Sequence, residues 1–161
     1  SLAQAFRDGG DTAAREDMAL CSLFGGLSLA NAKLGAVHGF AAPLGGMFPI
    51  PHGAVCARLI PAVVDVNVRA LQARAPASPA LARYDEVART LTGRVDARAE
   101  DGAAWLRSLV DELEIPMLSA YGVVAGDIAR VVEKARKASS MQGNPIELTE
   151  EELGEVLGSV V

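Results

Sequence analysis

The chain has 161 residues, which is enough for one compact domain with a core of useful size. Half of the residues are apolar but only 4% are aromatic, so the core must be built from alanine, leucine and valine, a composition that favours helices. The net charge is −5 and no basic block carries aromatic residues, which argues against a nucleic acid as partner. We find no apolar run of transmembrane length and no signal-type segment, and therefore expect a cytoplasmic protein without membrane contact.

Two helices are predicted at the beginning of the chain. Ser1–Arg7 carries apolar residues at helical spacing and starts without a methionine, so we interpret it as the tail of a helix in a fragment, a processed product or an excised domain. Asp11 or Thr12 can cap the next helix. Over Met18–Ala32 this second helix is apolar on all sides, and we therefore expect it to be buried.

The stretch Gly35–Gly53 contains both histidines of the chain, together with five glycines and three prolines. It predicts a short helix over 36–44, which Pro43 kinks or ends and Gly45-Gly46 breaks. A turn with two more prolines follows over 47–51. Such backbone chemistry suits a place where helices end and the main chain comes close to a ligand.

The remainder of the chain predicts further helices and no strand. A long helix runs from Ala54 to about Arg74, and Asp65 and Asn67 interrupt its apolar stripe, which we interpret as a solvated face. A helix follows from Pro79 to Gly93 after the Ser78 cap, and the next helix is capped by Asp101 and ended by Pro116. The last elements are a single turn over 117–121, a helix over 128–138 capped by Asp127, and a final helix opened by a capping box at Thr149. No stretch alternates over strand length, so the predicted fold class is an all-α, multi-helix domain over residues 1–161.

His38 and His52 are the candidate metal ligands. They lie fourteen residues apart on two segments that a proline-rich turn folds together. Neutral imidazole suits Zn²⁺, Fe²⁺ and similar metals, but a catalytic metal takes at least three protein ligands, so we interpret the pair as half of a site. The missing ligands come either from sequence outside these residues or from Cys21 and Cys56. With both cysteines, the site would be a structural Cys₂His₂ zinc in a non-catalytic helical module.

The pattern of this region resembles the signature of the iron-containing (group III) alcohol dehydrogenases. Leu34–Asn67 contains Gly-x-x-His, Leu-Gly-Gly, Pro-His-Gly, an Ile-Pro step and an Asn at matching intervals. Glu16–Ala32 is similar to the helix before that signature, and Gly143–Leu153 is similar to the C-terminal Asn-Pro segment and closing helix of the family. The resemblance covers essentially the whole chain.

The resemblance implies the C-terminal helical domain of such an enzyme, with a dehydroquinate-synthase-like fold. It implies an oxidoreductase that uses NAD or NADP, bound mainly by an N-terminal α/β domain, and Fe²⁺ or Zn²⁺ held by four ligands. His38 and His52 match the third and fourth ligands, whereas the Asp-x-x-x-His helix and the nucleotide domain have no counterpart in this chain. The expected partners are that missing domain, a small alcohol or carbonyl substrate and further copies of the protein, and the isolated piece is expected to lack turnover.

One position departs from the signature. Many members have a second histidine four residues after the first, where this chain has Ala42, so a proton relay through that position is not expected. Carried over from the family, the substrate pocket would lie near Leu29, Ala42 and Ser140. The maleylacetate reductase branch of the same superfamily is the alternative, and basic side chains near the site would favour it, but the sequence around the two histidines has none.

Overall fold

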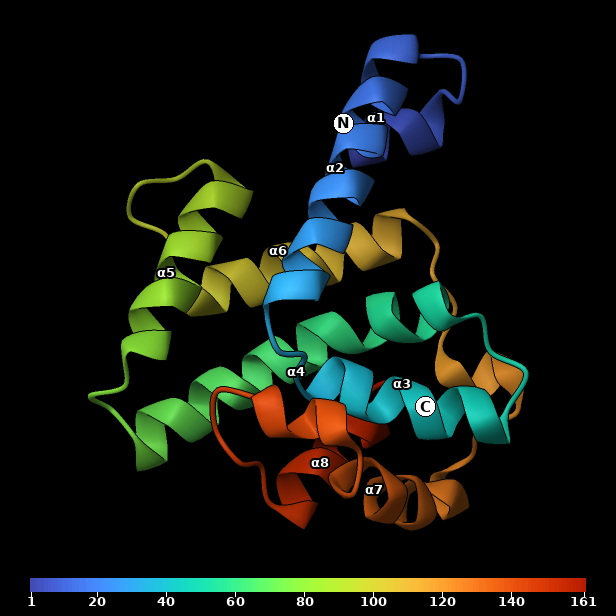
Figure 1. Ribbon diagram of the computed structural model, residues 1–161, viewed down its shortest axis with the longest axis vertical. Helices are drawn as coiled ribbons and strands as arrows, with labels where there is room; N and C mark the ends of the chain where they lie inside the picture. The colour runs from blue at the N-terminus through green and yellow to red at the C-terminus, as the bar shows by residue number, and fades with distance from the viewer.

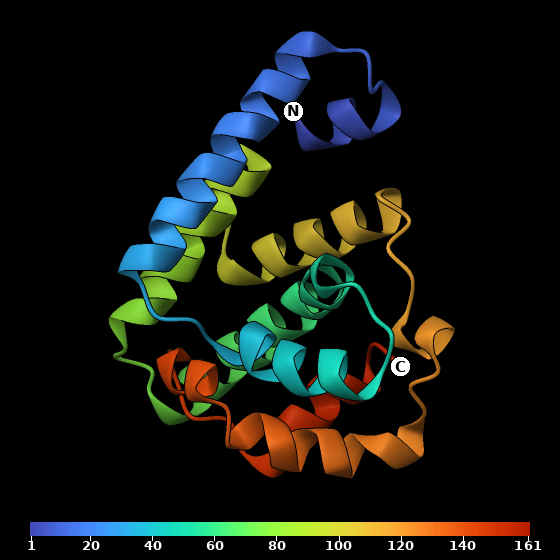
Figure 2. The same cartoon turned by 45° about the vertical axis from the view of Figure 1, so that its right-hand side comes forward.

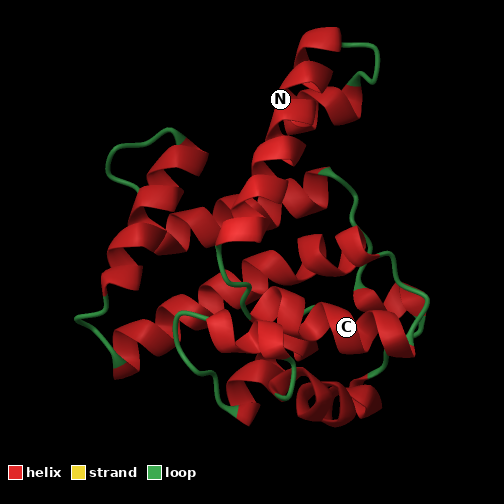
Figure 3. Ribbon diagram, viewed as in Figure 1, coloured by secondary structure: helices red, strands yellow, loops and turns green.

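The computed structural model describes residues 1–161 and is built from helices and loops, without a strand (Figure 3). This confirms the predicted all-α fold class. The α-helices are α1 (Leu2–Arg7), α2 (Thr12–Asn31), α3 (Ala36–Met47), α4 (His52–Arg74), α5 (Pro79–Thr92), α6 (Ala99–Glu112), α7 (Ile128–Arg136) and α8 (Glu150–Gly158), and the 3₁₀ helices are η1 (Leu118–Tyr121), η2 (Ala125–Asp127) and η3 (Ser139–Gly143).

Helix α4 is the centre of the molecule. It crosses the middle of the body in Figure 1 and contacts α3 and α8 as well as the α5–α6 pair. Its side chains Val55 and Leu59 are fully buried in a core that α3, α7 and α8 complete. Phe40 is the one aromatic residue of this buried core, and the rest is aliphatic, as the composition predicts.

Local capping signals are confirmed at three helix starts. The Asp11 carboxylate accepts a hydrogen bond from the backbone N–H of Ala14 at 3.0 Å, and the Ser78 hydroxyl accepts one from Ala80 at 3.3 Å. At α8, Thr149 and Glu152 form the reciprocal capping box. These contacts span only two or three residues, so the sequence pattern contains everything that determines them.

The predicted cap of α6 is wrong by three residues. The helix starts at Ala99, and Asp101 lies in its first turn, where its carboxylate accepts a hydrogen bond from the backbone N–H of Arg98 at 2.9 Å. The backbone N–H of Ala99 donates to the Asp85 carboxylate of α5, also at 2.9 Å. The Asp85 side chain of the neighbouring helix therefore satisfies a free backbone N–H at the start of α6, where the local sequence pattern predicted Asp101 as the cap.

Helix α3 is longer than predicted. It continues through Pro43 and the Gly45-Gly46 pair and ends at Met47, where the backbone N–H of Phe48 donates to the carbonyl of Leu44. Each glycine costs about 1 kcal/mol in a helix relative to alanine. The side chains of Phe40 and Leu44 are fully buried against the core, and this packing outweighs the local preference.

Helix α2 is exposed, which overturns the prediction that it is buried. Figure 2 shows α1 and α2 extending away from the body, and every residue from Ala19 to Asn31 is exposed. The large apolar side chains of α2 remain between 52% and 60% exposed: Leu20, Leu23, Phe24, Leu27 and Leu29. The composition indicated a helix that needs cover on all sides, but no element within these 161 residues supplies it.

By length and hydropathy, none of the individual helices is a candidate membrane span. Helices α2 and α3 meet that measure only when they are taken together, with a bend of 99° between them.

Replacing Phe24 and Leu27 by aspartate should reduce self-association of the chain. A contiguous apolar face of this size drives association in water, and two carboxylates on it oppose that association. Analytical ultracentrifugation should show the wild-type chain associating at concentrations where the double variant sediments as a monomer. Val95→Asp is the control, because Val95 is a single apolar residue, 91% exposed, in the loop between α5 and α6. An unchanged sedimentation coefficient in the double variant would contradict the prediction.

Candidate metal centre

The two histidines come together where α3 turns into α4. His38 is the third residue of α3 and His52 is the first residue of α4. The connection contains Pro49 and Pro51, and the buried Ile50 holds it against the core. The ring centroids of His38 and His52 lie 5.5 Å apart, with an angle of 49° between the ring planes. The structure therefore brings together the pair that the spacing predicted.

Cys56 completes a cluster with the two imidazoles. It lies one turn after His52 on α4, and its Sγ is 3.5 Å from Nε2 of His52 and 4.0 Å from Nε2 of His38. One potential ligand atom from each of the three residues lies within 4.8 Å of the other two. The cluster is thus a compact set of two nitrogens and one sulfur at the surface between α3 and α4.

The surroundings of His38 favour its neutral imidazole form. Burial lowers the pKa of His38, and the neighbouring His52 lowers it further. Neutral imidazole is the form that donates a lone pair to a metal. Burial also raises the pKa of the Cys56 thiol, so without a metal that group stays protonated.

The other predicted site residues lie apart from this cluster. Cys21 is exposed on α2 and is not among the converging ligand atoms, so the structure does not assemble the four residues of a Cys₂His₂ zinc site. Leu29 is exposed on α2, Ala42 is exposed on α3 one turn after His38, and Ser140 is half-buried in η3. Their assignment to a substrate pocket stays a prediction.

A buried amide pair supports the start of α3, and sequence analysis did not find it. Asn67 is 2% exposed, so its interpretation as part of a solvated face was wrong. Its carbonyl oxygen accepts from the Asn144 amide at 2.7 Å, and its amide donates to Asn144 Oδ1 at 3.2 Å and to the Tyr84 hydroxyl at 3.1 Å. The only signal in the sequence was that Asn67 and Asn144 both fall in segments that resemble the family.

Asn144 connects this amide pair to α3, the helix that carries His38. Its Oδ1 accepts a hydrogen bond from the backbone N–H of Ala36 at 3.1 Å, and its amide donates to the carbonyl of Ile146 at 2.8 Å. Ala36 opens α3 two residues before His38. The amide pair therefore fixes the first turn of the helix that carries one of the candidate ligands.

Comparison with known proteins assigns the chain. The sequence profile of the Fe-containing alcohol dehydrogenase family, C-terminal part, matches residues 1–161. The chain belongs to this family. The predicted resemblance is thereby confirmed, and the all-α architecture is that of the C-terminal part of this dehydrogenase family.

Several relatives are identical to this chain at about one third of the aligned residues. Alcohol dehydrogenase 4 of Schizosaccharomyces pombe is 35% identical over 161 residues, which is 99% of this chain and 36% of that protein. Choline dehydrogenase of Bacillus subtilis is 31% identical over 151 residues, 92% of this chain and 36% of that protein. A crystal structure of a 1,3-propanediol oxidoreductase superposes with a TM-score of 0.85 at 30% identity, covering 99% of this chain and 41% of that one. The chain thus spans about two fifths of the length of the relatives that it matches.

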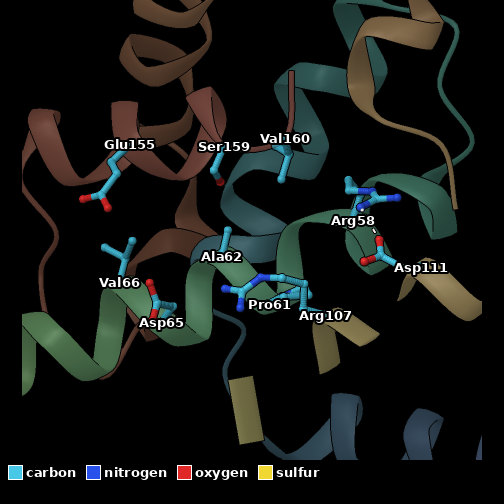
Figure 4. Close-up of a pocket in the computed structure, with 10 residues that line it drawn as sticks. All are labelled: Arg58, Pro61, Ala62, Asp65, Val66, Arg107, Asp111, Glu155, Ser159 and Val160. Carbon is cyan, nitrogen blue, oxygen red and sulfur yellow. Dashed lines mark hydrogen bonds and ion pairs between the residues drawn. The ribbon is translucent and has the colours of Figure 1, made fainter. Parts of the chain in front are cut away.

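The chain also has a charged pocket between α4, α6 and α8, with a volume of about 250 Å³ (Figure 4). None of its lining residues belongs to the histidine cluster. Arg58, which could serve an anionic substrate, instead donates to the carbonyls of Ile115 and Pro116 and pairs with Asp111 at 3.3 Å. Its guanidinium connects α4 to the segment after α6, a structural role that leaves it little capacity for a ligand.

Proposed function

We propose that this chain is the helical, metal-binding part of an NAD(P)-linked alcohol dehydrogenase that interconverts an alcohol with an aldehyde or ketone. In this proposal His38 and His52 are two of the metal ligands. The observation that carries it is the convergence of the two imidazoles, 5.5 Å apart, at the α3–α4 turn in a chain with no other histidine. Family membership supports the reaction class.

The donor set fits the metal that the family implies. Two imidazoles suit either Fe²⁺ or Zn²⁺. A bound metal would supply Lewis acidity at the oxygen of the alcohol or carbonyl, and the nicotinamide would exchange the hydride. Two histidines do not close a catalytic site, so in this proposal the remaining ligands and the nucleotide-binding domain come from outside these 161 residues. The relatives are long enough for such a part, because the chain covers only 36% of one and 41% of another.

The residues of this chain hold the ligands in place. His38 lies on α3, whose first turn is fixed by the hydrogen bond from Ala36 to Asn144. His52 begins α4, which is anchored in the core by the buried side chain of Val55. His52 is exposed, so its ring is accessible to a neighbouring domain. Ala42 has no proton to transfer, so the chain offers no relay one turn after His38. The exposed apolar face of α2 is the surface on which the rest of the protein would pack.

The proposal is tested by the metal affinity of the 161-residue chain. Zn²⁺ and Fe²⁺ affinities, measured by competition with a chromophoric chelator, should fall by at least about tenfold in His38→Ala and in His52→Ala, because each variant removes one ligand. Circular dichroism should show that both variants keep their helix content.

Cys21→Ser is the matched variant that separates the two models of the site. In the proposed dehydrogenase, it should bind metal as the wild type does, because Cys21 lies exposed on α2 outside the cluster. Loss of metal in Cys21→Ser comparable to that in His38→Ala would instead support a structural Cys₂His₂ zinc. Histidine variants with unchanged affinity would overturn the proposed ligand roles.

A further inference from the structure

The segment η3, together with Asn144 directly after it, packs on the first turn of α3, which carries His38. Before His38, the backbone N–H of Ala36 donates to Asn144 Oδ1 at 3.1 Å. Directly after His38, the buried Gly39 lies against the side chain of Met141. One segment from the far end of the chain therefore contacts the backbone of α3 on both sides of this histidine.

The side chain of Asn144 has a single orientation that satisfies all its partners. Its Oδ1 accepts from Ala36 and, at 3.2 Å, from the amide of Asn67, so both of its lone pairs are used. Its amide donates to Asn67 Oδ1 at 2.7 Å and to the carbonyl of Ile146 at 2.8 Å, so both of its protons are used. A rotated amide would turn an N–H group toward the N–H of Ala36. The acceptor for the first turn of α3 is thus fixed in place.

The contact on the other side of His38 depends on the absence of a side chain at Gly39. A Cβ at this position would lie 2.6 Å from Cε and 3.2 Å from Cβ of Met141. Met141 is itself half-buried against the core. Its thioether fills the space beside the α3 backbone, which limits how far the turn with His38 can shift toward η3.

Asn144 also sets the start of α3 relative to α4. Asn67 lies on α4, the helix that begins with His52, so the position of Asn67 relative to His52 is determined by that helix. The hydrogen bonds from Asn144 to Asn67 and from Ala36 to Asn144 therefore connect the two helices that carry the candidate ligands. Without Asn144, α4 keeps buried core side chains such as Val55, whereas the first turn of α3 loses its acceptor.

We propose that Asn144 and Met141 are positioning residues for His38, which place its imidazole relative to His52 without contacting the metal. The inference rests on the proposed function, in which both histidines are ligands, and goes beyond it by giving the η3 segment a role in metal binding. A ligand that is already in place needs less ordering when the metal binds, so loss of either contact lowers the metal affinity through His38.

Zn²⁺ affinity in two backgrounds tests this role. For the 161-residue chain, competition with a chromophoric chelator should show a loss of about tenfold in Asn144→Ala. In the His38→Ala background the same substitution should change the affinity by less than about twofold, because the ligand that Asn144 positions is already gone. A role in folding alone does not depend on His38 and would give equal fold-changes in both backgrounds. Gln72→Ala is the matched control, because it removes an amide that is bonded to Glu100 at the surface, and it should leave the affinity unchanged.

Met141→Ala tests the second contact without changing the amide pair. It should also lower the Zn²⁺ affinity in the wild type and not in His38→Ala, and it keeps the test decisive if circular dichroism shows that Asn144→Ala does not fold. Unchanged affinity in a folded variant would overturn the positioning role of that residue. Equal losses in both backgrounds, or a comparable loss in Gln72→Ala, would overturn the proposal while the histidine ligands stand. Unchanged affinity in His38→Ala itself would instead overturn the ligand role of His38, and the proposed function with it.

Discussion

Replacing Asn67 by leucine should destabilise the chain by about 2–4 kcal/mol, because it leaves buried polar partners without hydrogen bonds. Asn67 is 2% exposed, and its side chain makes two bonds with the amide of Asn144 and one with the hydroxyl of Tyr84. Leucine has the same number of side-chain heavy atoms and the same branching at Cγ and is somewhat bulkier, so the substitution leaves no cavity and the main loss is that of the hydrogen bonds. For a protein of this length the melting temperature should fall by roughly 10 °C, measured by circular dichroism.

A double-mutant cycle with Tyr84→Phe separates the network from general damage to the core. Burial raises the pKa of the Tyr84 phenol, and the hydrogen bond from Asn67 lowers it, so the hydroxyl is a buried neutral group that needs this partner. Tyr84→Phe should therefore cost clearly less in the Asn67→Leu background than in the wild type. Strict additivity would show that the two side chains do not act as one network.

Gln72→Leu is the matched control on the same helix. Gln72 is exposed and donates to Glu100 at the surface, so its replacement should change the stability by no more than about 0.5 kcal/mol. A loss in Asn67→Leu that did not exceed the loss in Gln72→Leu would mean that the buried amide pair contributes nothing measurable.

Features that depend on contacts between residues close in the sequence could be predicted, and features that depend on contacts between distant residues could not. The caps at Ser78 and Thr149 depend on side chains two or three residues from the backbone group that they satisfy, and the pattern alone predicted them. The burial of Asn67 depends on Asn144, which is 77 residues further along the chain, and a single sequence does not indicate that contact. The glycine pair of α3 predicts a break by local propensity, whereas the core contacts of Phe40 and Leu44 that override this propensity are long-range.

The candidate site shows the same limit. The meeting of His38 and His52 was predicted because a short helix and a proline turn leave little freedom over fourteen residues. The sequence offered Cys21 and Cys56 together as candidate ligands and contained nothing that separates one from the other. The structure separates them, since Cys56 lies in the cluster and Cys21 lies on an exposed helix. The exposure of α2 was not predicted, because its apolar sequence indicates that the helix packs against other protein surface but does not indicate whether that surface lies within these 161 residues.

The backbone contact that holds η3 against the start of α3 sets a limit on side-chain size. Gly143, the last residue of η3, lies directly on the segment before α3. A Cβ at this position would lie 2.7 Å from the Cβ of Lys33 and 2.9 Å from the carbonyl carbon of Leu34, and closer still to the Leu34 carbonyl oxygen. These neighbours are backbone or next to it, so they cannot move aside as a flexible side chain would.

Gly143→Ala should therefore cost about 3 kcal/mol or more, at the upper end of what overpacking usually costs. Relieving the clash moves η3 away from Leu34 and takes the adjacent Asn144 with it, which also weakens its hydrogen bonds to Ala36 and Asn67. Gly154→Ala is the matched control, because Gly154 lies inside α8 with open space around its Cβ position and should gain about 0.5–1 kcal/mol from helix propensity. Urea unfolding followed by circular dichroism measures both variants, and opposite signs are expected. A Gly143→Ala variant as stable as the wild type would show that the segment before α3 yields freely, in which case Asn144 could not hold the helix that carries His38 in one position.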